Sequence, residues 1–147
     1  MIRYLSVAAL VVAGATLAYA QGGPIAERKA AMKAIGGANK DLSDMAKGDV
    51  KFEAAKAIAS FKAMEDNLVK SKALYPDNSK TGGDTQALPA VWEKKADFMA
   101  KMDKAVADAK AAAAATKDEA SFKDAHKQMV TNCGGCHRDY RVPPPKK

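Results

Sequence analysis

Residues 98–129 read FMAKMDKAVADAKAAAAATKDEASFKDAHKQM, and this stretch decides the fold class. Its larger apolar residues recur at intervals of three or four, which is the period of one face of an α-helix. Alanine and lysine, both good helix formers, fill most other positions, whereas β-branched and aromatic residues are few. Thr116 interrupts the pattern, and its capping-box spacing to Glu119 predicts that a new helix begins there. The stretch therefore predicts two consecutive helices.

Two further segments towards the N-terminus show the same pattern. Pro24 suits a first helical turn, Gly48-Asp49 separates the two segments, and Pro76 with the polar loop 77–87 ends the second. We predict an all-α fold, an antiparallel up-down-up-down four-helix bundle formed by one domain over residues 21–147. The predicted helices cover residues 25–46, 50–74, 88–115, and 116 up to the Val142-Pro-Pro-Pro145 stretch.

The first twenty residues have the pattern of a secretory signal peptide. Arg3 precedes an apolar run of thirteen residues, 5–17, and the run ends in the small-residue sequence Ala18-Tyr-Ala20. The run is shorter than the roughly 20 residues that span a bilayer. We therefore predict cleavage after Ala20, export to the periplasm, and no membrane insertion of the mature chain.

The net charge of +7 comes from lysines that are interleaved with acidic residues along the chain. That pattern is typical of solvated helix faces, and it argues against a nucleic-acid-binding surface, where basic residues cluster. A mild positive field would instead steer an acidic partner protein towards the molecule.

The reactive and metal-binding side chains cluster in the motif Cys133-Gly-Gly-Cys136-His137, which contains both cysteines of the chain and one of its two histidines. On a helix these three side chains share one face. A dithiol redox site usually lies at a helix N-terminus in a strand-containing fold, and a structural zinc site needs a fourth ligand. His126 is 11 residues upstream, and we interpret it as a solvated helix residue. C-x-x-C-H is the signature of covalent haem c attachment, with the two thiols as thioethers and the histidine as an iron ligand.

The up-down topology predicts which residues meet the haem. The C-terminal motif lies at the same end of the bundle as the start of the first helix, so Met32, in its second turn, is the methionine that faces the iron opposite His137. The alternative for Met32 is packing in the core. Arg28, one turn earlier, is placed to pair with a haem propionate, and Arg141 is placed to do the same or to cover the proximal face.

The chain resembles the class II cytochromes c, the family of cytochromes c′ and of low-spin cytochromes of the c-556 type. The resemblance covers essentially the whole mature chain. It implies that Arg28 meets a propionate, that Asp84 lines the haem edge, that Arg141 lies on the proximal side, and that Met32 holds the distal position. The matching pieces are ERKAAMK (Glu27–Lys33), GGD (Gly82–Asp84), P-x-x-W (Pro89–Trp92) and CGGCHRDYR (Cys133–Arg141).

The same resemblance implies two possible functions, and the role of Met32 distinguishes them. In low-spin members a methionine binds the iron and the protein transfers electrons, which is the function we predict, with redox proteins as partners and no enzymatic turnover. In high-spin members the distal position is open and binds NO or CO, and some of these members also carry an unbound methionine there. A peroxidase-like enzyme would need a distal acid or base, and no histidine is left near Met32 to supply one. The family includes dimers built on the first two helices, so a homodimer is the expected assembly if one forms.

Overall fold

The structure is a computed structural model that describes residues 23–145. It consists of helices joined by turns and loops, in the order α1 (Gly23–Lys47), α2 (Ala54–Lys72), the 3₁₀ turn η1 (Asp77–Ser79), α3 (Ala90–Glu93), α4 (Lys95–Ala115) and α5 (Glu119–Tyr140). The predicted signal peptide lies outside the described residues. Among the described residues, no helix combines the length and the apolar character needed to cross a membrane.

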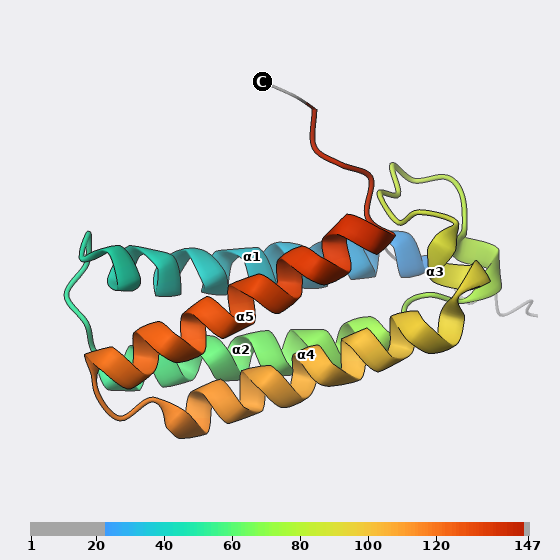
Figure 1. Cartoon of the computed structure of the whole chain (residues 1–147). Coiled ribbons are helices and arrows are strands. Elements are labelled where there is room, and N and C mark those ends of the chain that lie inside the picture. The colour runs from blue at the N-terminus through green and yellow to red at the C-terminus, as the bar shows by residue number, and fades with distance from the viewer. Residues whose placement is uncertain (1–22, 146–147) are drawn as a thin grey trace, which may run out of the picture.

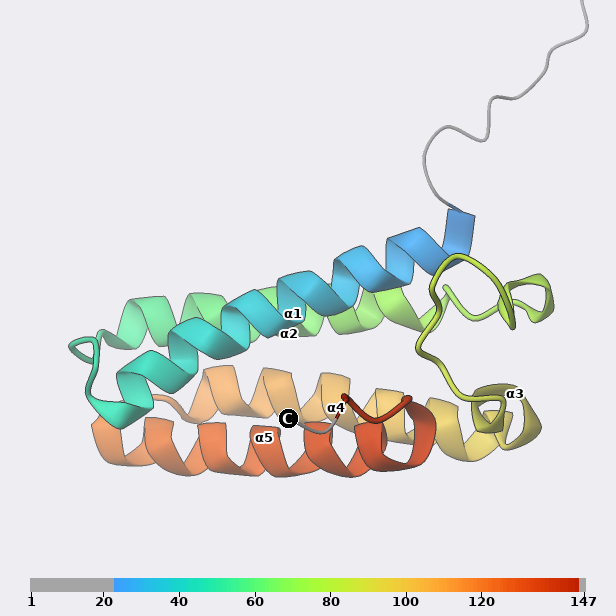
Figure 2. The same ribbon diagram turned by 90° about the horizontal axis from the view of Figure 1, so that it is seen from above.

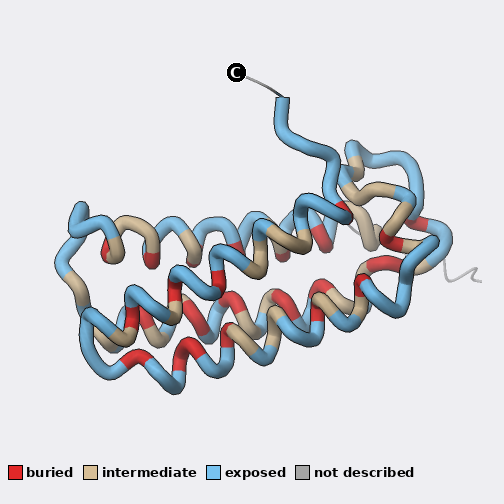
Figure 3. The backbone as a smooth tube through the Cα atoms, in the orientation of Figure 1, coloured by how far each residue is buried: buried red, intermediate tan, exposed pale blue. Residues whose placement is uncertain are grey.

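The four long helices form the predicted bundle, and their order along the chain gives the up-down-up-down arrangement (Figure 1). α1 packs mainly on α2, α2 on α4, and α4 on α5. Buried residues follow the inward faces of all four helices (Figure 3). The largest fully buried side chains include Phe61, Phe122, Leu42, Met64 and Met129. The all-α bundle predicted from periodicity is therefore confirmed.

The starts of the second and last helices differ most from the prediction, and α2 begins at Ala54, four residues later than predicted. The last helix begins at Glu119, with Asp118 as its N-cap and a capping box formed with Ser121, not with Thr116 and Glu119 as predicted. Thr116 instead ends α4, where its buried hydroxyl donates to the carbonyl of Ala112 at 2.8 Å. A serine three residues after an aspartate fulfils the same reciprocal bonding as the expected threonine and glutamate.

The third predicted helix is divided. Lys94 adopts φ −116° and ψ 44°, which separates the short α3 from α4. Trp92, two residues before the break, donates from its indole Nε1 to the carbonyls of Tyr75 and Pro76, both at 3.2 Å. The break therefore coincides with a contact to the loop that precedes α3, here called the linking loop (residues 73–89).

Candidate functional site

Cys133 and Cys136 lie one turn apart on α5 as free, half-buried thiols that pack against the core. Burial raises the pKa of both thiols, with the negative charge of Asp108 adding to the effect at Cys133. Dithiol redox exchange needs a thiol whose pKa is lowered, so this environment does not favour that chemistry. Among the described residues, no group of three or more His, Cys, Asp or Glu side chains is arranged to hold a metal ion.

His137 follows directly and is exposed on the surface of the protein. Its ring is nevertheless partly surrounded by protein, and this desolvation, with the nearby positive charge of Arg141, lowers the pKa of His137. The neutral imidazole is the form that binds a metal. The C-terminal turn of α5 therefore presents two thiols and a neutral imidazole within five residues.

The register between α1 and α5 is fixed by a polar contact in the half of the bundle away from the motif. His126 Nε2 lies 3.2 Å from Asn39 Oδ1 and 3.4 Å from Ser43 Oγ. His126 is buried, so its interpretation as a solvated residue was wrong. Because the two helices are antiparallel, moving seven residues from this contact along each one brings Met32 level with Cys133. Met32 is half-buried and packs against the core.

α1 and α5 diverge from this contact towards the end that carries the motif, here called the motif end (Figure 2). At the opposite end, the far end, α1 finishes and α5 begins. Half-buried apolar side chains from several elements line the core near the motif end, so an apolar group would find a ready surface there. These side chains belong to Met32, Ala87, Trp92, Met99, Cys133 and Cys136. The donor set and this apolar lining fit a covalently held haem.

Arg28 is 4% exposed and forms an extensive contact with the linking loop. Its Nη1 donates to Leu74 O (3.2 Å) and Ser79 Oγ (2.8 Å), and its Nη2 donates to Ser79 O (2.9 Å) and Thr85 Oγ1 (2.5 Å). The guanidinium also lies over the rings of Tyr75 and Trp92, at 5.1 and 5.6 Å. Desolvation lowers the pKa of Arg28. The propionate contact stays a prediction, and the loop contacts were not foreseen.

Arg141 and Asp84 lie at the motif end and belong to different contacts. Arg141 donates from Nε (3.0 Å) and Nη2 (2.8 Å) to Gln86 Oε1 in the linking loop. Asp84 has a side chain that is 96% exposed, lies 3.8 Å from Lys29 Nζ, and adopts a positive φ of 54°. The roles that we expected for both residues towards a haem stay predictions.

A second polar cluster ties α4 to the last turn of α5. The buried Tyr140 donates from its hydroxyl to Asp97 Oδ2 at 2.5 Å, and this hydrogen bond is the main reason that the pKa of Tyr140 is raised to about 12. Lys101 lies between the carboxylates of Asp97 and Asp139, at 4.0 and 3.5 Å. The predicted site did not include Tyr140, although the tyrosine stands three residues after His137.

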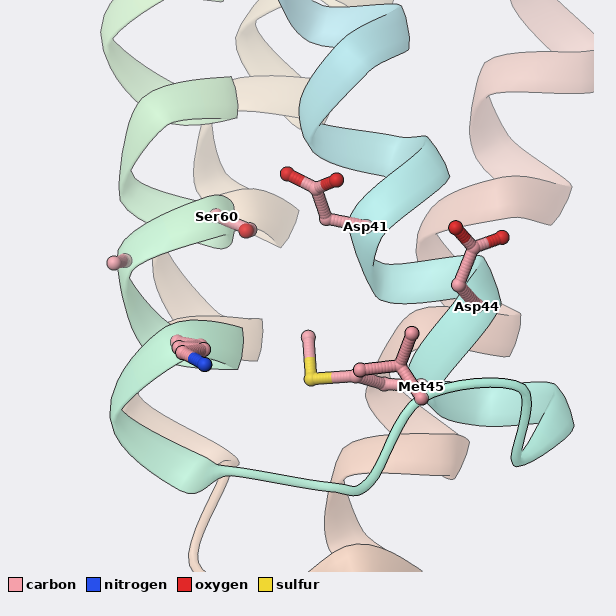
Figure 4. Close-up of a pocket in the computed structure, with 7 residues that line it drawn as sticks. Asp41, Asp44, Met45 and Ser60 are labelled. Carbon is pink, nitrogen blue, oxygen red and sulfur yellow. The ribbon is translucent and has the colours of Figure 1, made fainter.

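A cavity of about 320 Å³ lies between α1 and α2 at the far end. Figure 4 shows Asp41 and Asp44 on α1, with Met45 below them and Ser60 on the facing helix. Lys40 pairs with Asp44. None of the predicted site residues lines this cavity, so it is separate from the motif end.

Comparison with known proteins decides the family. A family model described as Cytochrome C′ matches residues 23–141. The chain belongs to the cytochrome c′ family. Proteins of this family are haem electron carriers that hold one haem c covalently. The free thiols and the apolar lining of the motif end agree with that cofactor.

Relatives named cytochrome c′ and cytochrome c-556 both match most of the chain. The chain is 45% identical to cytochrome c′ of Rhodopseudomonas palustris, over 96% of this chain and 97% of that protein. It is 36% identical to cytochrome c-556 of Agrobacterium fabrum, over 82% of each. The solved structure of the Rhodopseudomonas palustris cytochrome c′ superposes with a TM-score of 0.81 at 44% identity, covering 85% of this chain and 100% of that one.

Proposed function

We propose that Cys133 and Cys136 bind the haem c through thioethers, that His137 is the proximal iron ligand, and that the chain carries electrons in the periplasm. The observation that supports this most directly is the pair of free, half-buried thiols one turn apart, followed at once by His137. Haem c, when bound, supplies an iron that accepts and returns one electron and takes a further ligand opposite the histidine. The protein supplies the attachment, the axial imidazole and an apolar surround.

We further propose that the distal position is open, as in cytochromes c′, and that Met32 covers it without binding the iron. A relative that is 45% identical over nearly the whole chain is a cytochrome c′, whereas the cytochrome c-556 of Agrobacterium fabrum is 36% identical. Met32 packs against the core as a half-buried side chain, which is the environment of an apolar cover. On this proposal the reduced protein binds CO and NO.

Met32 as the sixth ligand is the second candidate, and one observation favours it. The register set by His126 and Asn39 brings Met32 of α1 level with Cys133 of α5, and this supports a thioether within reach of an iron held by His137. Relatives named cytochrome c-556 are 33% to 36% identical to the chain. A methionine with a histidine raises the reduction potential of a haem, which suits an electron carrier that binds no gas.

Optical spectra of the purified protein distinguish the two candidates. The first predicts a high-spin oxidised form, prompt CO binding by the reduced form, and little change in spin state on Met32→Leu. A methionine-to-iron charge-transfer band in the oxidised protein, lost in Met32→Leu, would contradict it and establish the second candidate. Met45→Leu is the matched control, because Met45 lies on the same helix at the far end.

The net charge suggests the type of partner protein, and the family resemblance suggests the assembly. The net charge of +7 for the whole chain favours an acidic redox partner, and a homodimer is the assembly that the family resemblance suggests. Association rates with an acidic partner should fall as ionic strength rises, because screening weakens electrostatic steering. Rates that are independent of salt would count against this type of partner.

A further inference from the structure

The linking loop is attached to α1 at three points, all within the first two turns of that helix. Arg28 donates its four hydrogen bonds to Leu74, Ser79 and Thr85. Gly83 approaches Ile25 so closely that a Cβ on this glycine, whose φ is +52°, would lie 3.1 Å from Ile25 Cγ2. The exposed pair of Lys29 and Asp84 adds a third, weaker contact.

The other end of the same loop is attached to the C-terminus of α5. Leu88 N donates to Tyr140 O at 3.0 Å, and Val142 N donates to Gln86 O at 2.8 Å. Ala87 and Arg141 form an isolated antiparallel bridge between these two bonds. The Arg141 guanidinium fixes the side chain of Gln86 as well. The loop therefore contacts α5 within five residues of His137.

These two attachments join the helices where they diverge. α1 and α5 separate towards the motif end (Figure 2), so the first turns of α1 are positioned there by the loop more than by α5. Met32 lies one turn after Arg28 on α1, and His137 lies one turn before Arg141 on α5. The two residues expected on opposite sides of the iron are thus each one turn from an anchor of the loop.

We propose that the linking loop is a strut that sets the separation between Met32 and His137, and with it the coordination of the iron, and that Arg28 is its main positioning residue. The proposal rests on the proposed function, because it requires haem at the motif end. Arg28 dominates because its planar guanidinium holds three loop residues through four hydrogen bonds, whereas a lysine has only three donors and no planar fork. The four hydrogen bonds of its terminal N–H groups all go to the loop, so this attachment is made by protein groups alone.

The test compares Arg28→Met, Arg28→Lys and Gln86→Ala with wild type in the haem-loaded protein. Lys33→Met is the control, because Lys33 is an exposed cation on the same helix. Hydrogen exchange of residues 76–87 reports the loop, and the oxidised spectrum reports the iron. We expect faster exchange in Arg28→Met, a larger low-spin fraction, and CO binding slowed about tenfold or more, because the freed Met32 competes for the iron. Arg28→Lys and Gln86→Ala should shift both readings in the same direction by less.

The double variant Arg28→Met/Met32→Leu identifies the competing ligand, since it should exchange fast in the loop yet keep the wild-type spin state. An unchanged spectrum and CO rate in Arg28→Met, despite faster loop exchange, would overturn the strut. If Arg28→Met does not fold, Arg28→Lys and Gln86→Ala decide by the same criterion. If wild type is already ligated by Met32, the open-position function fails, and the strut then predicts a larger high-spin fraction in Arg28→Met.

Discussion

The two ends of the bundle are built differently. At the far end, α1 and α5 are joined directly, by His126 with Asn39, and aromatic packing around Phe122 closes the core, with Phe52 and Phe61 at ring distances of 5.1 and 6.3 Å. At the motif end the same two helices diverge and are joined through the linking loop. The far end is closed by contacts between protein side chains, whereas we propose that a haem completes the motif end.

Removing the haem attachment should have the largest effect, because it should destabilise the motif end and leave the far end intact. In Cys133→Ser/Cys136→Ser the haem should become extractable by acidified solvent, whereas it stays with the wild-type chain. Amide protection should fall in residues 23–35 and 129–140 and persist near Phe122, because regions of a protein open with their own free energies. Hydrogen exchange with mass spectrometry checks this.

Glycine replacement supplies a control for that experiment. Gly134→Ala changes the motif without removing a thiol, and a Cβ at Gly134 meets nothing within 4 Å. This variant should retain covalent haem and wild-type protection. Equal loss of protection at both ends in the double serine variant would show that the bundle opens as one unit and that the two ends do not differ in stability.

Phe122→Ala tests the far end in the same way. Phe122 is 0% exposed and contacts two phenylalanine rings and His126. Deleting a buried phenyl ring typically costs about 3–5 kcal/mol. The free energy of unfolding by denaturant should fall by that amount, while the spin state and CO binding rate stay as in wild type. A changed spectrum in folded Phe122→Ala would mean that far-end packing reaches the iron.

The same contrast separates what the sequence predicted from what it could not. Helical periodicity predicted the bundle, and the spacing of Cys133, Cys136 and His137 predicted one face of one helix, because both depend on local geometry. Topology predicted that the start of the first helix lies at the same end as the motif, and Figure 1 shows the start of α1 and the end of α5 there. The contacts of Arg28 depend on where residues 74–85 fold in space, and no local pattern reports that.

His126 is a second residue whose environment depends on tertiary contacts that local sequence does not report. Charged residues surround it at positions 123, 124 and 127, so local composition favours a solvated side chain, but Asn39 and Ser43 approach it from α1. One signal was available. Asn39 and Ser43 are four residues apart on α1, and His126 lies one turn from Phe122 and Met129 on the apolar stripe of α5. Polar residues on facing stripes indicate a buried polar contact.

The smallest expected effect is the pH dependence of the free energy of unfolding that arises from His126. Burial lowers the pKa of His126 below that of the unfolded chain, about 6.5. The unfolded state therefore binds more protons between the two pKa values, so this contribution to stability is complete above about pH 6.5. The contribution of His126 to stability decreases as the pH falls through the folded-state pKa, with a slope of at most about 1.4 kcal/mol per pH unit for one proton.

Denaturant unfolding of wild type and His126→Gln from pH 8 to pH 5 measures this contribution, because glutamine keeps a donor for Asn39 but does not titrate. The difference between the two curves should grow only below pH 6.5, with an unchanged oxidised spectrum, since the joint between α1 and α5 lies outside the haem site. Parallel curves would mean that His126 accepts its proton without cost, and the far end would then be less tightly closed than its contacts imply.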